Sequence, residues 1–360
     1  VGTGMRDLGM TVPVDGIGNV TGVWAGPGTE GSAAPVMTGS HIDTVRTGGR
    51  YDGNLGVLAG LEVVETLAEA GHSPARPIAV AFFTDEEGSR FPPDMLGSLV
   101  YVGGMSLQDA LDIEDIDGAV VGAELERIGY RGAAPCPGPA PHAFVELHIE
   151  QGPVLEADGV TIGAVESVQG ISWTELTISG QSNHAGTTPM SMRRDPGFVA
   201  ASITTFVRDL ALELGGAQVA TVGQVNLHPN LVNVVPASAT MTVDLRNTDE
   251  ATLQEAERRL VEHCQRLASS ENVSIETRSL ARFEPVIFDP DVVDLVHTTA
   301  KQLGHSVQRM PSGAGHDAQM LARVCPTAMI FTPSENGLSH NPAEHTEPAD
   351  LEAGANVLLH

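Results

Sequence analysis

The stretch IAVAFFTDEEGSRF, residues 78–91, decides the fold class of this chain. Its first six residues, 78–83, are all apolar, which suits a β-strand that is buried on both faces. The run stops at Thr84, and three acidic residues, Asp85, Glu86 and Glu87, follow at once. A strand buried on both faces belongs to a sheet that helices cover, so this stretch predicts an α/β fold with polar groups at the strand end.

The segments around this stretch repeat the same organisation. Residues 36–39 form a short, mostly apolar run that ends at Ser40 and His41, and residues 143–149 alternate into His148. Between the first two strands, residues 55–70 have the apolar spacing of a helix. Apolar strands that alternate with helices predict a mixed sheet in which most strands are parallel.

The pattern changes near residue 171. Residues 172–179, 217–225, 239–246 and 273–282 alternate as strands, whereas residues 196–214 and 249–268 read as helices. The order β-α-β-β-α-β is that of a ferredoxin-like α+β domain. The α/β pattern returns after residue 285, so we expect a domain at residues 1–170 and 285–360, interrupted by a second domain at residues 171–284.

Composition excludes some classes of partner. The chain has 360 residues, enough for two domains, and 19 basic against 46 acidic residues give a formal charge of −27. This negative charge repels phosphate backbones, so we expect no nucleic-acid partner. No run of 18 apolar residues occurs, so we expect no membrane span.

The cysteines and the start of the chain suggest a cellular location. Cys136, Cys264 and Cys325 are odd in number and far apart, which argues against a disulfide framework. No signal peptide opens the sequence, and we therefore expect a cytoplasmic protein. The first five residues resemble mid-domain sequence, so we expect the native chain to begin before Val1.

Polar residues cluster where apolar segments end. The ligands of open α/β sheets bind at the carboxyl ends of the strands. Together the clusters supply three imidazoles and several carboxylates, an inventory that suits zinc. Two metals need a bridging carboxylate, and a hydrolase also needs a carboxylate that is not a ligand, as base. Adjacent Glu86 and Glu87 could divide these tasks. The clusters are residues 40–44, 49–53, 84–88, 147–152 and 338–341.

Each of these signals has a plainer interpretation when it stands alone. Asp85, Glu86 and Glu87 could form a solvated acidic turn, and a single histidine is usually a surface or core residue. The joint occurrence at successive strand ends favours a metal site, but spacing alone does not say which ligands pair.

Nine stretches, in order, resemble the hydantoinase/carbamoylase branch of the aminoacylase/carboxypeptidase superfamily of dinuclear zinc hydrolases. This branch holds N-carbamoyl-L-amino acid hydrolases, β-ureidopropionases and allantoate amidohydrolases. The stretches are GSHIDTV at 39–45, GGRYDGNLGVLAGLEV at 48–63, FTDEEGSRF at 83–91, ELHIEQGPVLE at 146–156, HAGTTPM at 184–190, NVVP at 233–236, DLR at 244–246, SGAGHDAQ at 312–319 and LSHNPAEHT at 338–346.

The resemblance implies a zinc-peptidase-like catalytic domain that holds two divalent metal ions, zinc by preference, with manganese or cobalt as alternatives. His41 and His148 would bind one ion, Glu87 and His340 the other, and Asp52 would bridge them. Glu86 would be the general base, and the Asp43 carboxylate would orient the His41 imidazole. Peptidases of the superfamily typically have an acidic residue where His148 stands, so this position favours the carbamoylase branch.

For the inserted domain, the resemblance implies a lid that also forms a homodimer. It would carry His184, Asn233 and Arg246 to the substrate, with Arg246 binding a carboxylate and His184 donating to the developing oxyanion. The catalytic domain would add Gln151, for the ureido group, and the loop with Gly315, His316 and Asp317, although Gln151, His316 and Asp317 could equally be structural. We expect Gly186 to take a positive φ in the turn after His184.

The resemblance implies a hydrolase that cleaves the carbamoyl C–N bond of an N-carbamoyl-L-amino acid or a related ureido acid and releases ammonia and carbon dioxide. Allantoate and β-ureidopropionate are alternative substrates, and an N-acyl amino acid deacylase or dipeptidase is a more distant alternative. A binding protein that has lost catalysis is disfavoured because Glu86, all five ligand positions and Arg246 are intact. A nucleotide-binding protein is disfavoured because no GxGxxG motif opens a strand–helix unit.

Overall fold

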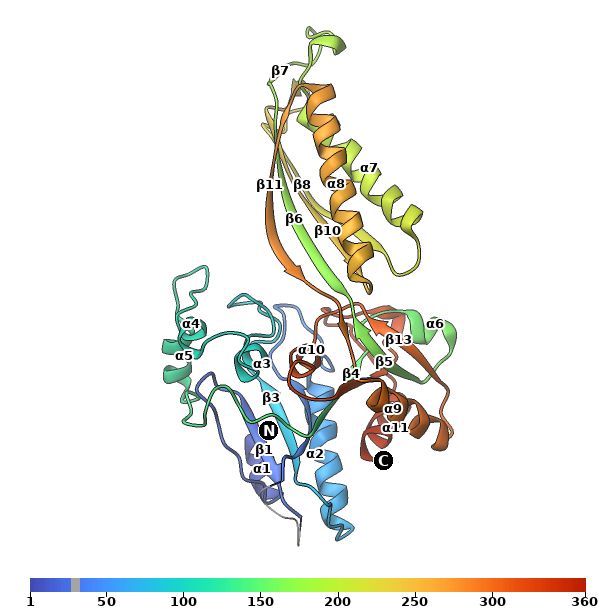
Figure 1. The fold of residues 1–360 in the computed structure, drawn as a ribbon. Helices are drawn as coiled ribbons and strands as arrows, with labels where there is room; N and C mark the ends of the chain where they lie inside the picture. Colours follow the sequence, from blue (N-terminus) through green and yellow to red (C-terminus); the bar gives the residue numbers. More distant parts are fainter. Residues whose placement is uncertain (27–32) are drawn as a thin grey trace. The chain divides into compact units, whose positions relative to one another are not determined.

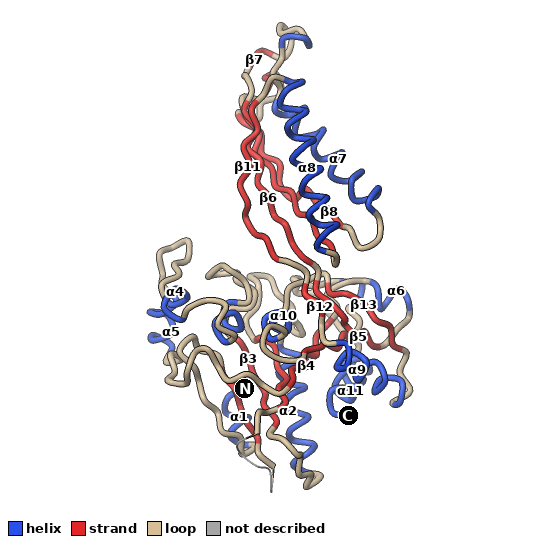
Figure 2. The backbone as a smooth tube through the Cα atoms, viewed as in Figure 1, coloured by secondary structure: helices blue, strands red, loops and turns tan. Residues whose placement is uncertain are grey.

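The computed structural model describes residues 1–26 and 33–360 and divides the chain into two compact units. Unit 1 comprises Val1–Ser167 and Ile287–His360, and unit 2 comprises Val168–Val286. These boundaries lie a few residues from those that the change of sequence pattern suggests. Figures 1 and 2 show the elements of both units.

Unit 1 is built on an eight-stranded sheet with the order β1-β3-β2-β4-β14-β5-β12, in which β13 pairs with β5. The four neighbours β3, β2, β4 and β14 are parallel to one another, while β1 and β5 join this group antiparallel. The predicted mixed, mainly parallel sheet is confirmed. The strands are β1 Val20–Trp24, β2 Val36–His41, β3 Ile78–Phe83, β4 Ala143–Ile149, β5 Ile162–Val168, β12 Val286–Ile287, β13 Val307–Ser312 and β14 Thr327–Thr332.

Helices pack on both faces of this sheet. Val145 of β4 faces a cavity lined by α9 and α11, whereas Glu146, the next residue, accepts a hydrogen bond from Ala318 of α10. Successive side chains of a strand point to opposite faces, so α10 lies across the sheet from α9 and α11. The helices of unit 1 are α1 Gly2–Asp7, α2 Asn54–Glu69, α3 Leu96–Tyr101, α4 Leu107–Leu111, α5 Val121–Ile128, α6 Val154–Asp158, α9 Pro290–Gln302, α10 Asp317–Leu321 and α11 Pro348–Leu359, with a 3₁₀ turn at Glu335–Gly337.

Helix α2 shows how the sequence sets this packing. Its buried residues recur at helical spacing along one face, and they include Val57, Val63 and Val64. A Cβ atom at Gly56 would overlap the carbonyl oxygen of Leu147 in β4. Only glycine therefore allows the helix to approach the sheet so closely.

The parallel strands bring the polar clusters together. His41 is the last residue of β2, the acidic residues Asp85, Glu86 and Glu87 follow β3, and His148 lies one residue before the end of β4. Because β2, β3 and β4 are parallel neighbours, their carboxyl ends meet at one edge of the sheet.

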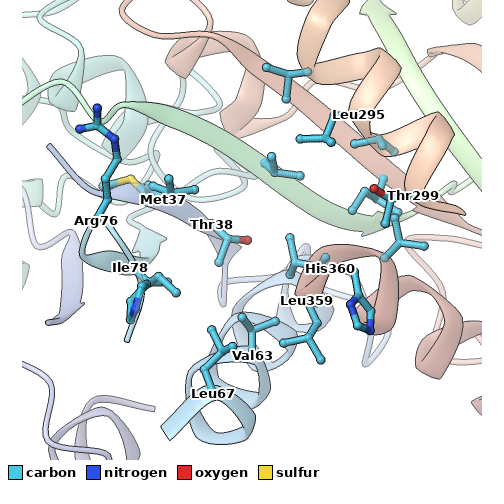
Figure 3. A pocket seen from close by; sticks show the side chains of 18 of the residues that line it. Met37, Thr38, Val63, Leu67, Arg76, Ile78, Leu295, Thr299, Leu359 and His360 are labelled. Carbon is cyan, nitrogen blue, oxygen red and sulfur yellow. The ribbon is translucent and has the colours of Figure 1, made fainter. Parts of the chain in front are cut away.

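A largely apolar cavity of about 470 Å³ opens elsewhere in unit 1, between the sheet and helices α2, α9 and α11. Figure 3 shows Val63 and Leu67 of α2, Leu295 and Thr299 of α9, and Leu359 of α11 around it. None of the residues expected at the functional site lines this cavity. This apolar cavity and the cluster of reactive groups are therefore different places.

Unit 2 has a four-stranded antiparallel sheet with the order β11-β6-β10-β8. Helices α7 and α8 lie side by side against it (Figure 1), and a short pair, β7 and β9, stands apart. The connection order and strand order are those of a ferredoxin-like sheet. The elements are β6 Gly170–Ser179, β7 Asn183–His184, α7 Pro196–Leu214, β8 Val219–His228, β9 Val234–Val235, β10 Ser238–Asn247, α8 Glu250–Glu271 and β11 Ser274–Phe283, with a 3₁₀ turn at Met190–Met192.

Local sequence explains these elements. The Asp195 side chain accepts hydrogen bonds from the backbone of Gly197 and Phe198 and so caps α7, whose first residue is Pro196. Along β10, buried and partly buried residues alternate, so one face of the strand packs against the two helices.

Two further observations concern membrane-spanning helices and the cysteines. In the described ranges, 1–26 and 33–360, no helix is long and apolar enough to cross a membrane. Cys136, Cys264 and Cys325 are all free thiols.

Candidate metal centre

Three side chains from separate segments meet at the carboxyl edge of the sheet in unit 1. His41 ends β2, His148 lies near the end of β4, and Asp52 directly precedes the turn into α2; all three are buried. Oδ1 of Asp52 lies 3.5 Å from Nε2 of His41 and 3.2 Å from Nε2 of His148. The three ligand atoms could hold one metal ion.

Asp52 belongs to a second group as well. Its other oxygen, Oδ2, lies 3.4 Å from Nε2 of His340, and the same nitrogen lies 3.3 Å from Oε2 of Glu87. Asp52, Glu87 and His340 thus form another set of potential metal ligands. One carboxylate with one oxygen directed to each group is the arrangement that a bridging ligand needs.

The backbone fixes which nitrogen each buried histidine presents. Nδ1 of His41 lies 3.0 Å from the carbonyl oxygen of Asp43, and Nδ1 of His148 lies 2.8 Å from the carbonyl oxygen of Ile149. A carbonyl can only accept, so Nδ1 is the donor in both rings. Nε2 of each neutral ring is then the nitrogen that carries a lone pair; in His148 this lone pair accepts the Gly53 N–H at 3.2 Å, a bond that a metal ion would have to displace.

Burial and charge shift the pKa values of this cluster. Burial by itself would lower the pKa of His41, but the carboxylates of Glu86, Asp52 and Asp43 reverse the effect and hold the pKa well above its usual value. Burial would likewise raise the pKa of Asp52, yet hydrogen bonds from His148, His340 and His41 hold it far below the usual range. The imidazoles and the central carboxylate of the metal-free protein therefore stabilise each other's charged forms.

Glu86 lies beside the first group without belonging to either ligand set. Its Oε2 is 3.5 Å from Nε2 of His41, and only 6% of the residue is exposed. Burial, opposed by the charge of His41, raises the pKa of Glu86 well above its usual value. The result is a protected carboxylate whose affinity for a proton is increased, as a general base requires.

Asp43 acts on the acidic turn more directly than on His41. Its carboxylate accepts hydrogen bonds from the backbone N–H groups of Glu86 and Glu87, both at 3.2 Å. The same carboxylate is 3.7 Å from Nδ1 of His41, whose hydrogen bond goes to the Asp43 carbonyl instead. The expected orientation of His41 by Asp43 is thus made through the main chain, and the side chain fixes Glu86 and Glu87.

The donor set fits two divalent cations. It consists of three imidazoles and of carboxylates, the ligands that zinc accepts, and manganese or cobalt could replace zinc. Oε1 of Glu87 is buried and has no hydrogen-bond partner within the described ranges, which leaves a lone pair for a cation. Burial, and next the charge of Asp52, raise the pKa of Glu87, so positive charge is in deficit here.

The other predicted residues of unit 1 lie around this cluster. Gln151, at a φ of 59°, donates from Nε2 to Oδ2 of Asp52 at 3.1 Å, while its Oε1 has no partner within residues 1–26 and 33–360. His316 is 1% exposed, packs edge-on against His148 at 4.6 Å between ring centroids, and meets Ser312 through Nε2. Burial lowers the pKa of His316 well below its usual value. Gly315 directly precedes it in the loop.

The predicted residues of unit 2 are more exposed. His184 in β7 and Asn233 next to β9 lie on neighbouring segments, since the Ala185 N–H donates to the carbonyl oxygen of Asn233. Nδ1 of His184 accepts the backbone N–H groups of Gly186 and Thr187 at 3.0 and 3.3 Å. The prediction of a positive φ at Gly186 is wrong, because the turn closes on the His184 ring and needs no left-handed residue.

Arg246 lies on β10 and has a carboxylate partner in its own strand. Its Nε and Nη2 donate to Asp244, two residues earlier on the same face, at distances of 2.9–3.1 Å. The guanidinium also lies 5.9 Å from the centre of the Trp173 ring. Asp244 therefore holds the orientation of Arg246.

Sequence reasoning gave no role to two buried carboxylates beside the cluster. Glu146 accepts hydrogen bonds from Ser40 and from the Ala318 backbone, and Glu344 accepts them from the Tyr51 and Asp52 backbone. A signal existed for Glu146, which stands two residues before His148 and so shares its face of β4. For Glu344, nothing in the sequence pointed to a partner almost three hundred residues earlier.

The sequence matches peptidase family M20/M25/M40 over residues 37–360. The chain therefore belongs to this family, as the motifs indicated. It is also similar in structure to an amidase of the hydantoinase/carbamoylase family from Burkholderia multivorans, with a TM-score of 0.95, 45% identity, and coverage of 99% of this chain and 87% of that one.

Two curated relatives narrow the likeness further. The chain is 42% identical to an N-carbamoyl-L-amino-acid amidohydrolase of Rhizobium meliloti, over 99% of this chain and 85% of that protein. It is 38% identical to an allantoate amidohydrolase of Escherichia coli, over 98% of this chain and 86% of that protein. The predicted class, a hydrolase of C–N bonds other than peptide bonds, agrees with both names.

Proposed function

We propose that this protein is a dinuclear metal amidohydrolase that cleaves the carbamoyl C–N bond of an N-carbamoyl-L-amino acid or a related ureido acid. The observation that carries the proposal is the shared carboxylate of Asp52, which joins two ligand groups beside the non-ligand carboxylate of Glu86. The family membership and the names of the relatives support the same class of reaction.

Five residues would hold the two cations: His41 and His148 the first, Glu87 and His340 the second, and Asp52 both. When bound, the cations would supply a water of lowered pKa and polarise the carbamoyl carbonyl group. Glu86 would take the proton of the attacking water at its Oε atoms and pass it to the leaving nitrogen. Its burial keeps bulk water from competing for that proton.

His184 would stabilise the negative charge that develops on the carbamoyl oxygen. Because its Nδ1 accepts two backbone N–H groups, the neutral ring carries its proton on Nε2. The ring therefore presents a hydrogen-bond donor outward, and its side chain is exposed. A donor directed at a developing oxyanion typically contributes about 10²–10³-fold to turnover.

Arg246 would bind the carboxylate of the amino-acid part, with Asn233 as a further polar contact. The guanidinium fork suits a carboxylate, and Asp244 restricts its rotation before substrate arrives. Gln151 would offer its Oε1, which has no hydrogen-bond partner among the described residues, to an N–H group of the ureido moiety. Between them, these groups would recognise the carboxylate and the ureido moiety of a ureido acid.

We further propose that the protein is a cytoplasmic homodimer joined through unit 2 and that His184, Asn233 and Arg246 act on the metal centre of the partner subunit. Strand β8 supports this because it is an edge strand that exposes the apolar residues Val219 and Val225. Met190 and Met192, near His184, are 76% and 70% exposed, which suits a surface that a partner covers.

The test is a substrate panel with the purified protein, stripped of metal and reloaded with zinc, manganese or cobalt. We expect ammonia release from N-carbamoyl-L-amino acids, allantoate or β-ureidopropionate only after reloading. Release of the acyl acid from N-acyl amino acids or dipeptides, without ammonia from any carbamoyl compound, would reassign the protein as a deacylase or dipeptidase. Two bound metals with no turnover of any compound would favour a binding protein.

A further inference from the structure

We propose that Glu344 is a positioning residue of the metal centre: its buried carboxylate joins the loop that carries Asp52 to the loop that carries His340. This inference rests on the proposed function, because it assigns Glu344 a task toward the bound cations. Glu344 lies four residues after His340, and only 3% of it is exposed. The two loops that it connects come from opposite ends of the chain.

One carboxylate oxygen holds the first loop. Oε1 of Glu344 accepts the backbone N–H of Tyr51 at 2.9 Å and that of Asp52 at 3.2 Å. These two donors belong to the residue that would bridge the cations and to its neighbour. Since charge-assisted hydrogen bonds are strong, Glu344 limits the movement of the backbone from which the Asp52 side chain projects.

The other oxygen holds the second loop. Oε2 of Glu344 accepts the Ser339 hydroxyl at 3.0 Å, and Ser339 directly precedes His340. The same hydroxyl lies 3.3 Å from Oδ2 of Asp52 and 3.3 Å from the Nε2 atom of Gln151. Asp52 Oδ2 is the atom directed at His340, so Glu344 and Ser339 set the separation of two ligands in one group.

Gly49 makes room for this carboxylate. A Cβ atom at residue 49 would overlap both the Cδ and the Oε1 atoms of Glu344. The glycine has no positive φ, so its lack of a side chain, and not its backbone freedom, is what the site uses. The position of the Glu344 carboxylate therefore depends on glycine at residue 49, and a methyl group there should displace the carboxylate.

The two ligand groups depend on Glu344 to different degrees. His41 and His148 are buried and held by backbone carbonyls, so the first group keeps two fixed ligands without Glu344. The His340 side chain is 50% exposed, and its residue has a φ of 53° in a loop. Loss of Glu344 should therefore weaken the second cation much more than the first.

The experiment measures the affinity of each cation in a competition titration with a chromophoric chelator, together with the visible spectrum of the cobalt-loaded protein. We expect Glu344→Ala to weaken the second cation by about 10–100-fold, the usual cost of losing a group that orients ligands, and to alter the cobalt spectrum. Glu344→Gln keeps an oxygen for the Tyr51 and Asp52 N–H groups and should restore most of the affinity. Gly49→Ala should resemble Glu344→Ala, and Glu352→Ala, at an exposed position of α11, is the matched control.

Several outcomes would overturn the assignment. It is wrong if folded Glu344→Ala binds both cations as the unaltered protein does, or if both affinities fall equally along with the melting temperature of the metal-free form. If Glu344→Ala does not fold, Ser339→Ala decides, because unchanged affinity for the second cation there contradicts the proposal. Failure of the unaltered protein to bind two cations would instead refute the proposed function itself.

Discussion

The residues expected at the active site are held very differently in the two units. In unit 1, His41, Asp52 and His148 are at most 2% exposed, and each contacts other members of the cluster. In unit 2, His184 and Asn233 lie at the surface, and their hydrogen bonds are made to the nearby backbone. The residues of unit 1 are therefore preorganised to bind a cation, whereas the side chains of unit 2 are exposed and can contact a ligand or a partner from solution.

Under the proposed function, the two groups of residues would contribute to catalysis in different ways, and mutation can separate these contributions. Changes among the buried residues of unit 1 should alter metal content or proton transfer. Changes at the exposed residues of unit 2 should leave the metals in place and alter the binding of substrate or transition state.

The largest effect is expected for Glu86→Gln. The change preserves shape and removes the proton acceptor, so turnover should fall by about 10²–10⁴-fold while two metals stay bound. Metal analysis and ammonia release measure the two quantities on the same sample. Glu69→Gln, at an exposed position near the end of α2, is the control. Near-normal turnover in Glu86→Gln would remove Glu86 from the reaction.

His184→Ala should lower turnover by about 10²–10³-fold with unchanged metal content, because it deletes the donor to the oxyanion. His72→Ala, at an exposed position of unit 1, is the control.

If His184 acts across the dimer, mixing His184→Ala with Glu86→Gln gives heterodimers in which one site has both defects and the other has neither. Random exchange should then restore about a quarter of the original activity. A mixture that exchanges subunits and stays inactive would contradict the shared site.

A smaller effect is expected at Arg246. Arg246→Ala should raise KM by about 10- to 100-fold, the cost of losing hydrogen bonds to a charged group, with both metals retained. Asp244→Asn should act in the same direction but more weakly, since it only loosens the guanidinium. Steady-state kinetics check both variants, and Arg266→Ala, exposed on α8, is the control. A change in kcat without a change in KM would indicate another role for Arg246.

Local patterns predicted most of the fold. The helix expected at residues 196–214 is α7 Pro196–Leu214, because a capping aspartate and an N-terminal proline mark its start. The helix expected at residues 249–268 extends to Glu271 as α8, since it ends at Asn272 in the left-handed conformation, which no glycine signalled. The spacing of apolar residues and the residues that cap helices are local properties, and a single sequence is enough to identify them.

The proximity of the candidate ligands was predictable from the sequence, whereas their hydrogen bonds were less so. Strand ends and family motifs indicated His41, Asp52 and His340. In the structure, Asp52 lies beside His41 in one group of potential ligands and beside His340 in the other. The partnership of Glu344 with the Asp52 backbone was not predictable, because it joins loops 292 residues apart and uses a main-chain donor that every residue possesses. Contacts of this kind depend on the tertiary fold and carry no residue-type signal.

The smallest predicted effect concerns stability and follows from the buried charges of unit 1. Burial lowers and neighbouring carboxylates raise the pKa of His41, with a net increase, and burial raises the pKa of Glu86. Both groups of the metal-free protein therefore bind more protons when folded than when unfolded at neutral pH. Stability falls with rising pH wherever the folded state holds more protons. The pKa of Asp52 is lowered, so its contribution to stability is complete above the unfolded pKa of an aspartate and is lost only in acid, below that pKa.

The melting temperature of the metal-free protein should consequently fall as pH rises from about 5 to 9, the window above the unfolded glutamate pKa that includes the unfolded histidine pKa. Each kcal/mol lost lowers the melting temperature of a domain of about 150–250 residues by about 2–4 °C. Bound cations need deprotonated ligands, so the loaded protein should lose this dependence or reverse it. Thermal melts in chelator and in excess zinc across this range test the pair, and His72→Ala should behave as the unaltered protein does. If the melting temperature of the metal-free protein stays level or increases with pH, then the folded cluster in unit 1 does not bind more protons than the unfolded chain. The raised pKa values of His41 and Glu86 would then be wrong.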